Sequence, residues 1–326
     1  MPGPDDVLIE VHSVGVSFPD LLLSKGQYQL RPEPPFTLGI DVAGVVVGGF
    51  EMVASATSLR DGPDGPPQDA ASTSGVTFRP GDRVAGVVPY GGAAELAVVP
   101  ATSTFSLPDE VSFDQGAALP MNYLTAQFAL RERGQIRAGE TVLVHGAAGG
   151  VGTATLQVAR GYGARTVAVV STEQKAEFAR AAGADETVLL DGFKDAVLAL
   201  TGGRGVDLVL DVAGGDVFTD SLRCLAPLGR LLVVGFAAGQ GIPEVKVNRL
   251  LLNNIDVRGV GWGGYAMVRP GYMQPQWAEL IPMIESGVVR PPVGATYPLD
   301  EFGRALADLD ARLALGKSVV RVKVEE

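Results

Sequence analysis

Three glycines, Gly149, Gly150 and Gly152, stand between the apolar run 141–145 and a segment of helix-forming residues. Glycine has no Cβ, so a loop built from these residues can approach a ligand closely. The first N–H groups of a helix have no partner inside the helix and can bind an anion. The pattern predicts a site for the pyrophosphate of a dinucleotide, and the alternative is an ordinary tight turn. We expect contacts from Ala148, Gly149, Gly150 and Val151.

The end of the next predicted strand, 166–170, bears on which dinucleotide binds. Folds that bind NAD carry Asp or Glu there, which accepts a hydrogen bond from the ribose 2′-hydroxyl. This chain has Ser171, and Lys175 follows one helical turn later. A charged hydrogen bond from lysine to a 2′-phosphate contributes ~1.5–3 kcal/mol. We therefore expect NADPH, although Glu173 opposes it and Lys175 could instead be a solvent-facing helix residue.

The composition argues against several other classes of protein. Formal net charge is −11, and Lys and Arg form no cluster that would bind nucleic acid. Cys224 is the single cysteine, so no disulfide can form within the chain, as is usual in a reducing cytosol. No apolar run reaches the ~18 residues that span a bilayer. We expect a cytoplasmic protein with neither a nucleic-acid nor a membrane partner.

The elements that must position these residues alternate regularly from about residue 122 onward. The predicted strands are 141–145, 166–170, 187–190, 206–212, 230–235 and 255–260. Between them lie helical segments near 150–162, 173–182, 193–201, 216–225 and 247–253. Short β-branched strands that alternate with helices predict an α/β fold, a doubly wound parallel sheet of the Rossmann kind.

The two ends of the chain follow a different pattern. Strands are predicted at 7–16, 42–47, 83–88 and 94–99, and residues 51–75, which contain few large apolar residues, predict a solvated loop. Helices near 276–287 and 300–314 precede a last strand at 319–324. Since the parallel sheet has no place for that strand, we expect it to return to the N-terminal β-rich domain. The predicted domains are 122–260 and, around it, 1–121 with 261–326.

Several motifs, in this order along the chain, carry a resemblance to a known family. They span residues 15–20, 35–44, 80–84, 118–125, 145–152, 202–207 and 229–236. The chain resembles the medium-chain dehydrogenase/reductase superfamily in its zinc-free NADPH:quinone oxidoreductase branch. The resemblance implies a GroES-like catalytic domain around the Rossmann domain, and a homodimer. It also matches Lys175 to a lysine that contacts the phosphate, while Asp191 stands where relatives often have a tyrosine.

The same resemblance addresses zinc. Zinc sites in proteins use Cys and His ligands, and the chain has only His12, His145 and Cys224. Ser17 stands where zinc-dependent relatives carry a cysteine ligand, and residues 39–41 replace their Gly-His-Glu stretch. We therefore expect no metal, and reduction of an activated acceptor rather than oxidation of simple alcohols.

The resemblance implies two catalytic candidates. Tyr28 aligns with a tyrosine that lines the active site of quinone reductases; its phenol, with a pKa near 10, is protonated at neutral pH and suits a proton donor. The alternative is that Tyr28 only packs against the wall of the cleft. Ser17 could donate a second hydrogen bond, or be an ordinary loop serine. Asp20 and Asp41 fit structural roles better than acid–base catalysis.

Further candidates complete the expected site. At the nicotinamide we expect Asn122, Thr125 and Phe236. An apolar pocket for a planar acceptor would contain residues that could equally belong to the core: Leu22, Met121, Trp262 and Tyr265. The expected function is zinc-independent hydride transfer from NADPH to a small-molecule acceptor, a quinone or an α,β-unsaturated carbonyl compound. The alternatives are a 2-enoyl thioester reductase and a non-catalytic NADPH-binding protein resembling the lens crystallins of this family.

Overall fold

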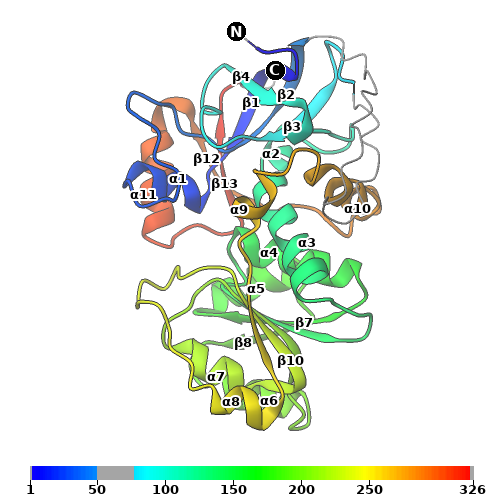
Figure 1. Cartoon of the computed structure of the whole chain (residues 1–326), viewed down its shortest axis with the longest axis vertical. Coiled ribbons are helices and arrows are strands. Elements are labelled where there is room, and N and C mark those ends of the chain that lie inside the picture. Colours follow the sequence, from blue (N-terminus) through cyan, green and yellow to red (C-terminus); the bar gives the residue numbers. More distant parts are fainter. Residues whose placement is uncertain (1, 50–76, 324–326) are drawn as a thin grey trace, which may run out of the picture.

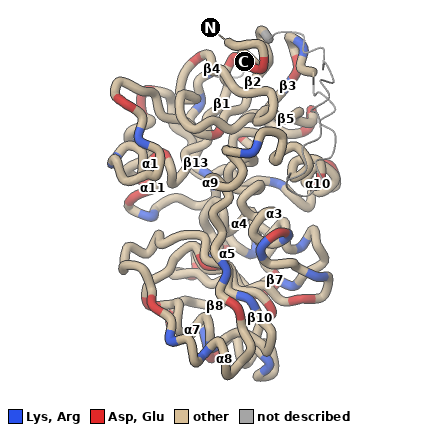
Figure 2. The backbone as a smooth tube through the Cα atoms, in the orientation of Figure 1, with Lys and Arg blue, Asp and Glu red and all other residues tan. Residues whose placement is uncertain are grey.

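The computed structural model describes residues 2–49 and 77–323 and has two lobes (Figure 1). Strands from near both ends of the chain, β1 (Asp6–Gly15) and β13 (Lys317–Arg321), lie in one lobe, and the middle of the chain forms the other. The loop predicted over 51–75 lies outside the described residues. Basic and acidic residues alternate over both lobes (Figure 2).

The first lobe is built on a seven-stranded sheet with the order β12-β13-β1-β2-β3-β5, in which β4 also pairs with β1. β13 runs antiparallel to β1, with Val320 opposite Val14. The prediction that the last strand returns to the N-terminal domain is therefore confirmed. The sequence pattern missed two strands of this sheet, β5 and β12. The remaining bounds are β2 (Asp41–Gly49), β3 (Arg83–Val87), β4 (Leu96–Pro100), β5 (Thr104–Ser106) and β12 (Val293–Pro298).

The second lobe contains a six-stranded sheet with the order β11-β10-β9-β6-β7-β8, and all of its pairs are parallel. Its strands are β6 (Thr141–His145), β7 (Arg165–Val170), β8 (Glu186–Leu189), β9 (Val206–Asp211), β10 (Leu225–Val233) and β11 (Asp256–Gly259). The helices between them are α4 (Gly150–Gly161), α5 (Glu173–Ala181), α6 (Phe193–Leu200), α7 (Val217–Arg223) and α8 (Asn248–Asn253). The predicted fold class, a Rossmann sheet inserted in a GroES-like β-rich domain, is confirmed.

Further helices lie at the ends and edges of the two sheets. Residues 120–133 form one continuous helical segment of π-helical and α-helical turns, η2 (Pro120–Leu124), α3 (Thr125–Phe128) and η3 (Ala129–Arg133). The others are α1 (Phe18–Ser24), η1 (Ala101–Ser103), α2 (Phe113–Gly116), α9 (Trp262–Ala266), α10 (Met273–Glu285), η4 (Leu299–Glu301) and α11 (Phe302–Asp310).

The largest cluster of buried apolar side chains crosses from one lobe to the other. It joins Ala85 and Phe105 of the first sheet to Val142 and Leu208 of the parallel sheet. Burial of this kind stabilises the contact between the lobes. The proposed division at residues 121/122 and 260/261 stays a prediction.

Across the described residues, every helix is too short or too polar to cross a bilayer. The cytoplasmic location stays a prediction.

Candidate active site

The glycine loop follows β6 as the sequence predicts. The amide of Gly149 donates to the carbonyl oxygen of Gly146 over 2.9 Å, and α4 begins at Gly150. A Cβ built on Gly152 would lie 2.2 Å from the Gly146 carbonyl oxygen, so only glycine lets α4 approach the strand this closely. At Gly149, a Cβ would meet only that same oxygen, at 3.4 Å. The loop therefore packs tightly against the end of β6 at Gly152 and leaves free space beside Gly149.

The start of α4 has the properties of an anion site. In the described part of the chain, no side chain caps the amides of its first turn, because Gly149 occupies the N-cap position. β6 lies between β7 and β9, where the chain leaves the sheet centre in opposite directions. Ligands of such sheets bind at this switch point, beyond the carboxyl ends of the strands. The cradle left by Gly149 has room for a pyrophosphate, and the contacts of Gly150 and Val151 with a cofactor stay predictions.

The residues after β7 meet a segment from near the C-terminus. Thr172 caps α5 by accepting the amide of Lys175 over 3.2 Å. The Lys175 ammonium donates to the backbone carbonyl oxygen of Arg312 over 3.4 Å. The Arg312 guanidinium in turn donates to the carbonyl oxygen of Ala238, beyond β10, over 2.6 Å. Half-buried Lys175 and exposed Arg312 therefore meet beyond the carboxyl ends of β7 and β10, and only Lys175 was predicted from the sequence.

Of the three residues predicted to contact the nicotinamide, two lie against segments that follow the carboxyl ends of the parallel strands β6 and β9. Asn122 is buried, and a Cβ built on Gly150 would lie 2.5 Å from its Nδ2 atom, so its amide covers the start of α4. Phe236 follows β10 and is partly exposed, beside Gly214 in the loop after β9. Thr125 is buried at the start of α3. Their contacts with a cofactor stay predictions.

Ser17 belongs to a buried ionic cluster. Its hydroxyl donates to Asp41 Oδ2 over 2.8 Å and accepts a hydrogen bond from the Lys317 ammonium over 2.6 Å. Lys317 also forms a 2.6 Å ion pair with Asp41, and its side chain is only 4% exposed. The second carboxylate oxygen of Asp41 accepts the amide of Met121 over 2.8 Å. No pattern in the sequence predicted a role for Lys317.

Asp20 and Tyr28 lie next to this cluster. Asp20 accepts the amides of Ser17 and Gly39, each over 2.9 Å, which agrees with its predicted structural role. Burial raises the pKa of the Asp20 carboxyl to about 7. Burial, and then the neighbouring Asp20 carboxylate, raise the pKa of the Tyr28 phenol. Tyr28 therefore stays protonated at neutral pH, as a proton donor must.

The four predicted pocket residues differ in their burial and in the residues that they contact. A Cβ built on Gly263 would lie 3.5 Å from the Tyr28 hydroxyl, so α9 carries Trp262 and Tyr265 close to Tyr28. Trp262 is buried, and its Nε1 donates to Gln276 over 2.9 Å. Tyr265 is partly exposed and packs on two aromatic rings, Phe128 and Tyr272. Met121 is buried beside Asp41, and Leu22 is half-buried on α1.

The histidines and the cysteine have other surroundings. His145 Nε2 lies 2.7 Å from Ser221 Oγ, and burial lowers the pKa of His145 to about 4. Burial raises the pKa of the Cys224 thiol to about 12. Within residues 2–49 and 77–323, no group of three or more His, Cys, Asp or Glu side chains is placed to hold a metal ion. The metal-free site stays a prediction.

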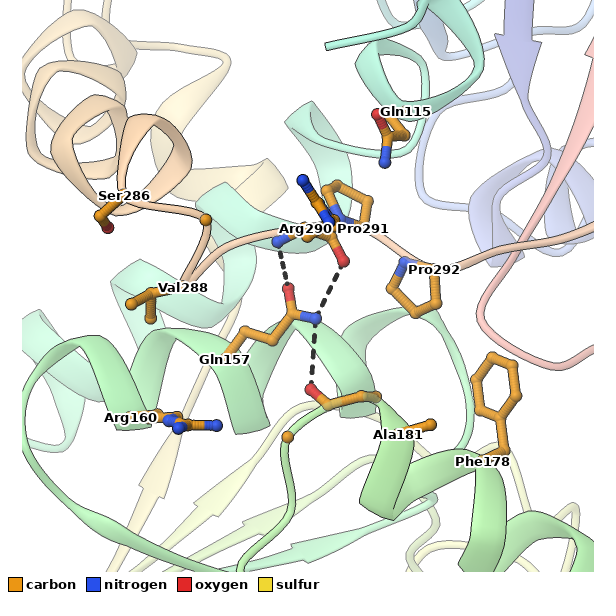
Figure 3. A pocket seen from close by; sticks show the side chains of 13 residues that line it. Gln115, Gln157, Arg160, Phe178, Ala181, Ser286, Val288, Arg290, Pro291 and Pro292 are labelled. Carbon is orange, nitrogen blue, oxygen red and sulfur yellow. Dashed lines mark hydrogen bonds between the residues drawn. The ribbon is translucent and has the colours of Figure 1, made fainter. Parts of the chain in front are cut away.

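A groove of about 630 Å³ lies near the other end of α4 (Figure 3). Gln157 closes its floor: its side chain accepts the amide of Arg290 and donates to the carbonyl oxygens of Arg290 and Ala182. Gln157 stands seven residues after Gly150, about 10 Å along the helix. The groove is therefore separate from the glycine loop, at the seam where the chain returns to the first lobe.

Comparisons with known proteins agree with this arrangement. The model of the alcohol dehydrogenase GroES-like domain matches residues 3–109, and that of the zinc-binding dehydrogenases matches 150–286. The chain is 35% identical over 324 residues to quinone oxidoreductase-like protein 2 of Rattus norvegicus, covering 98% of this chain and 86% of the rat protein.

Two solved structures extend the likeness to three dimensions. A probable oxidoreductase of Mycobacterium abscessus has a TM-score of 0.82 and 41% identity, covering 98% of this chain and 91% of the other. The quinone oxidoreductase of Thermus thermophilus, also solved as a complex with NADPH, has a TM-score of 0.80 and 34% identity, covering 99% and 93%. The chain therefore belongs to the quinone oxidoreductase family of the medium-chain dehydrogenases/reductases.

Proposed function

We propose that this protein transfers hydride from NADPH to a quinone or to an α,β-unsaturated carbonyl compound, without a metal ion. The observation that carries the proposal is the glycine cradle at the switch point, which the Gly316–Ala148 hydrogen bond joins to the strand that carries Lys317, the partner of Ser17. The T. thermophilus relative solved with NADPH supports the choice of cofactor. When bound, NADPH supplies the hydride, and the protein supplies orientation and protons.

The chain's own residues divide this task. The amides at the start of α4 would hold the pyrophosphate, and Lys175 with Arg312 would bind the 2′-phosphate. As hydride adds to the β-carbon of an enone, the C=C electron pair shifts to the bond between the α-carbon and the carbonyl carbon, and the C=O pair moves onto the oxygen to give an enolate. Tyr28, kept protonated by its raised pKa, would donate a hydrogen bond to that oxygen and transfer a proton.

The chemistry of the ligands supports the metal-free proposal. Ser17, which stands where zinc-dependent relatives carry a cysteine ligand, offers a hydroxyl instead of a thiolate. That hydroxyl and Asp41 Oδ2 both bind the Lys317 ammonium. Ile40, between Gly39 and Asp41, provides no ligand atom. A divalent ion at Ser17 would have to displace a buried cation.

We also propose a homodimer formed along β11. This strand is one of the two edges of the parallel sheet, the other being β8, and unpaired edges can bind another strand. Beside it, α8 and the residues before it expose four large apolar side chains, Ile242, Val247, Leu251 and Leu252. A second copy of the chain would cover both features through a twofold axis. Light scattering should give twice the chain mass, and Leu251→Glu combined with Leu252→Glu should give the monomer.

The proposed activity is tested with purified protein, NADPH and a panel of acceptors: quinones, enones and enoyl-CoA esters. We expect quinones or enones to accelerate NADPH oxidation at least tenfold over the acceptor-free rate. Preference for the enoyl-CoA esters would favour a 2-enoyl thioester reductase. Protein that binds NADPH but oxidises it no faster with any acceptor would be the non-catalytic alternative, and the catalytic proposal would fail.

A further inference from the structure

Lys317 is the most deeply buried ion-paired cation described above, and no step of the proposed reduction yet uses it. Its ammonium contacts two acceptors, Ser17 Oγ and Asp41 Oδ2, each at 2.6 Å. Asp41 is fully buried and Lys317 nearly so. Burying a charged pair costs desolvation, and apolar residues of similar volume often stabilise a protein as well or better. Stability alone therefore gives little reason for this pair.

The cluster fixes the direction of each hydrogen bond. An ammonium only donates, so Ser17 Oγ accepts from Lys317 and its single proton points to Asp41 Oδ2. Asp41 Oδ1 accepts the amide of Met121, which immediately precedes Asn122, the residue that covers the start of α4. The Ser17 hydroxyl is thus held in one orientation by a cation on its lone pair and a carboxylate on its proton.

The backbone next to Lys317 reaches the cofactor loop. Gly316 donates its amide to the carbonyl oxygen of Ala148 over 2.8 Å and forms a parallel bridge with Gly149. Gly316 has a φ of +60°, and a Cβ there would lie 2.2 Å from the carbonyl oxygen of Pro292. The position therefore requires glycine. Lys317 then begins β13, so the glycine loop and the Ser17 hydroxyl are joined through two consecutive residues.

We propose that Lys317 is a positioning residue for the reduction, and this rests on the proposed function. Lys317 couples the glycine loop to Ser17. Its positive charge also balances the Asp41 carboxylate when the Ser17 hydroxyl turns its proton away from Asp41 and toward the acceptor. In that step, hydride adds to the β-carbon, the C=C pair shifts to the bond between the α-carbon and the carbonyl carbon, and the C=O pair moves onto the oxygen, giving an enolate that Tyr28 protonates. Ser17 donates a hydrogen bond to this oxygen, and Lys317 remains bonded to Ser17 Oγ and Asp41.

The test uses variants that preserve the balance of charge. Lys317→Met alone leaves a buried, unpaired carboxylate and is expected to unfold the protein. The double variant Lys317→Met/Asp41→Asn removes both charges, while the asparagine can still accept the Met121 amide. The matched control is Lys323→Met/Glu10→Gln, which removes a partly exposed ion pair of 2.6 Å that involves β1, the strand paired with β13.

We expect the double variant to fold, to bind NADPH within about twofold of the wild type, and to lose at least tenfold in kcat. Adding Ser17→Ala to it should lower kcat no further, because both changes act on one hydroxyl. The control pair should turn over like the wild type. A double variant with wild-type kcat, or losses that multiply with Ser17→Ala, would overturn the proposal.

A second measurement needs no turnover. In the wild type, NADPH should slow amide hydrogen exchange both at residues 146–152 and in α1, which begins after Ser17. In the double variant, protection should remain at 146–152 and disappear from α1. Equal protection of α1 in both proteins would show that Lys317 does not couple the two. If the wild type reduces no acceptor, the proposed function fails, while hydrogen exchange still decides the coupling.

Discussion

The Lys175 ammonium and the backbone carbonyl oxygen of Arg312 lie 3.4 Å apart, although 137 residues separate them in sequence. This contact brings half-buried Lys175 beside the backbone of exposed Arg312, beyond the carboxyl end of β7. Each can form a charge-assisted hydrogen bond with a 2′-phosphate. Lys175→Ala and Arg312→Ala should therefore each raise the Kd of NADPH about tenfold and leave that of NADH within about twofold. Fluorescence titration with both cofactors measures the difference.

Arg304→Ala is the control for this pair, since Arg304 is an exposed arginine of α11 that pairs with Glu301. Its Kd values should match those of the wild type. An equal loss of NADPH and NADH affinity in the Lys175 variant would contradict the assignment of the 2′-phosphate site.

Tyr28→Phe removes the phenol hydroxyl and keeps the ring. We expect kcat with enones to fall at least tenfold, because a general acid contributes ~10²–10⁴-fold, while the Kd of NADPH stays unchanged. The raised pKa of Tyr28 also predicts that any loss of kcat from Tyr28 ionisation comes at a higher pH than for a free tyrosine. Steady-state kinetics across pH checks both. Unchanged turnover in the variant would make Tyr28 a wall residue.

Gly152→Ala should disrupt the cofactor site through packing. The new methyl group would lie 2.2 Å from the Gly146 carbonyl oxygen, so the start of α4 must move away from β6. We expect a stability loss of about 1–3 kcal/mol and loss of measurable NADPH binding. Gly303→Ala is the matched control in α11, where a Cβ meets nothing within 4 Å, and it should stabilise the protein by about 0.5–1 kcal/mol. Thermal unfolding with and without NADPH distinguishes the two.

His145 should make the protein less stable in acid. Burial lowers its pKa from 6.5 to about 4, so between these values the unfolded chain binds a proton that the folded protein does not. The free energy of unfolding therefore decreases as pH falls from 6.5 to 4, by up to about 3 kcal/mol. His145→Gln, whose amide can still donate to Ser221, should flatten this part of the curve. The free energy of unfolding is measured with denaturant at each pH. If it changed with pH equally in the wild type and the variant, the assignment to His145 would be wrong.

Asp20 should give the opposite slope. Burial raises its pKa from 3.8 to about 7, so over this range the folded protein holds a proton that the unfolded chain has lost. The free energy of unfolding contributed by Asp20 thus increases as pH falls from 7 to 4. Asp20→Asn should remove that increase, whatever its effect on absolute stability. Denaturant unfolding at each pH measures this. If Asp20 were ionised in the folded protein, the unfolding free energies of the variant and the wild type would depend on pH in the same way.

The sequence predicted the parallel sheet well because its signals are local. β6 has the predicted bounds, and Gly149, Gly150 and Gly152 form the predicted loop. The last strand was also assigned to the right sheet, since the alternation of strands and helices had already ended. β5 and β12 were missed: β5 has only three residues, and β12 contains Gly294 and ends in Pro298, which weaken a strand pattern.

The residues of the candidate site also fall into two groups, those predicted from the local sequence and those that only the fold brings together. Residue type and spacing predicted the anion loop, Ser171 and Lys175, because a strand, a glycine loop and a helix lie within one short stretch of chain, and their contacts with a cofactor stay predictions. Arg312 and Lys317 gave no such signal, since each has ordinary neighbours in sequence. Only folding brings Arg312 to Lys175 and Lys317 to Asp41, when β13 pairs with β1 and its first residues meet the glycine loop. Neighbouring residues determine local geometry, whereas a buried charge meets its partner only after distant strands have paired.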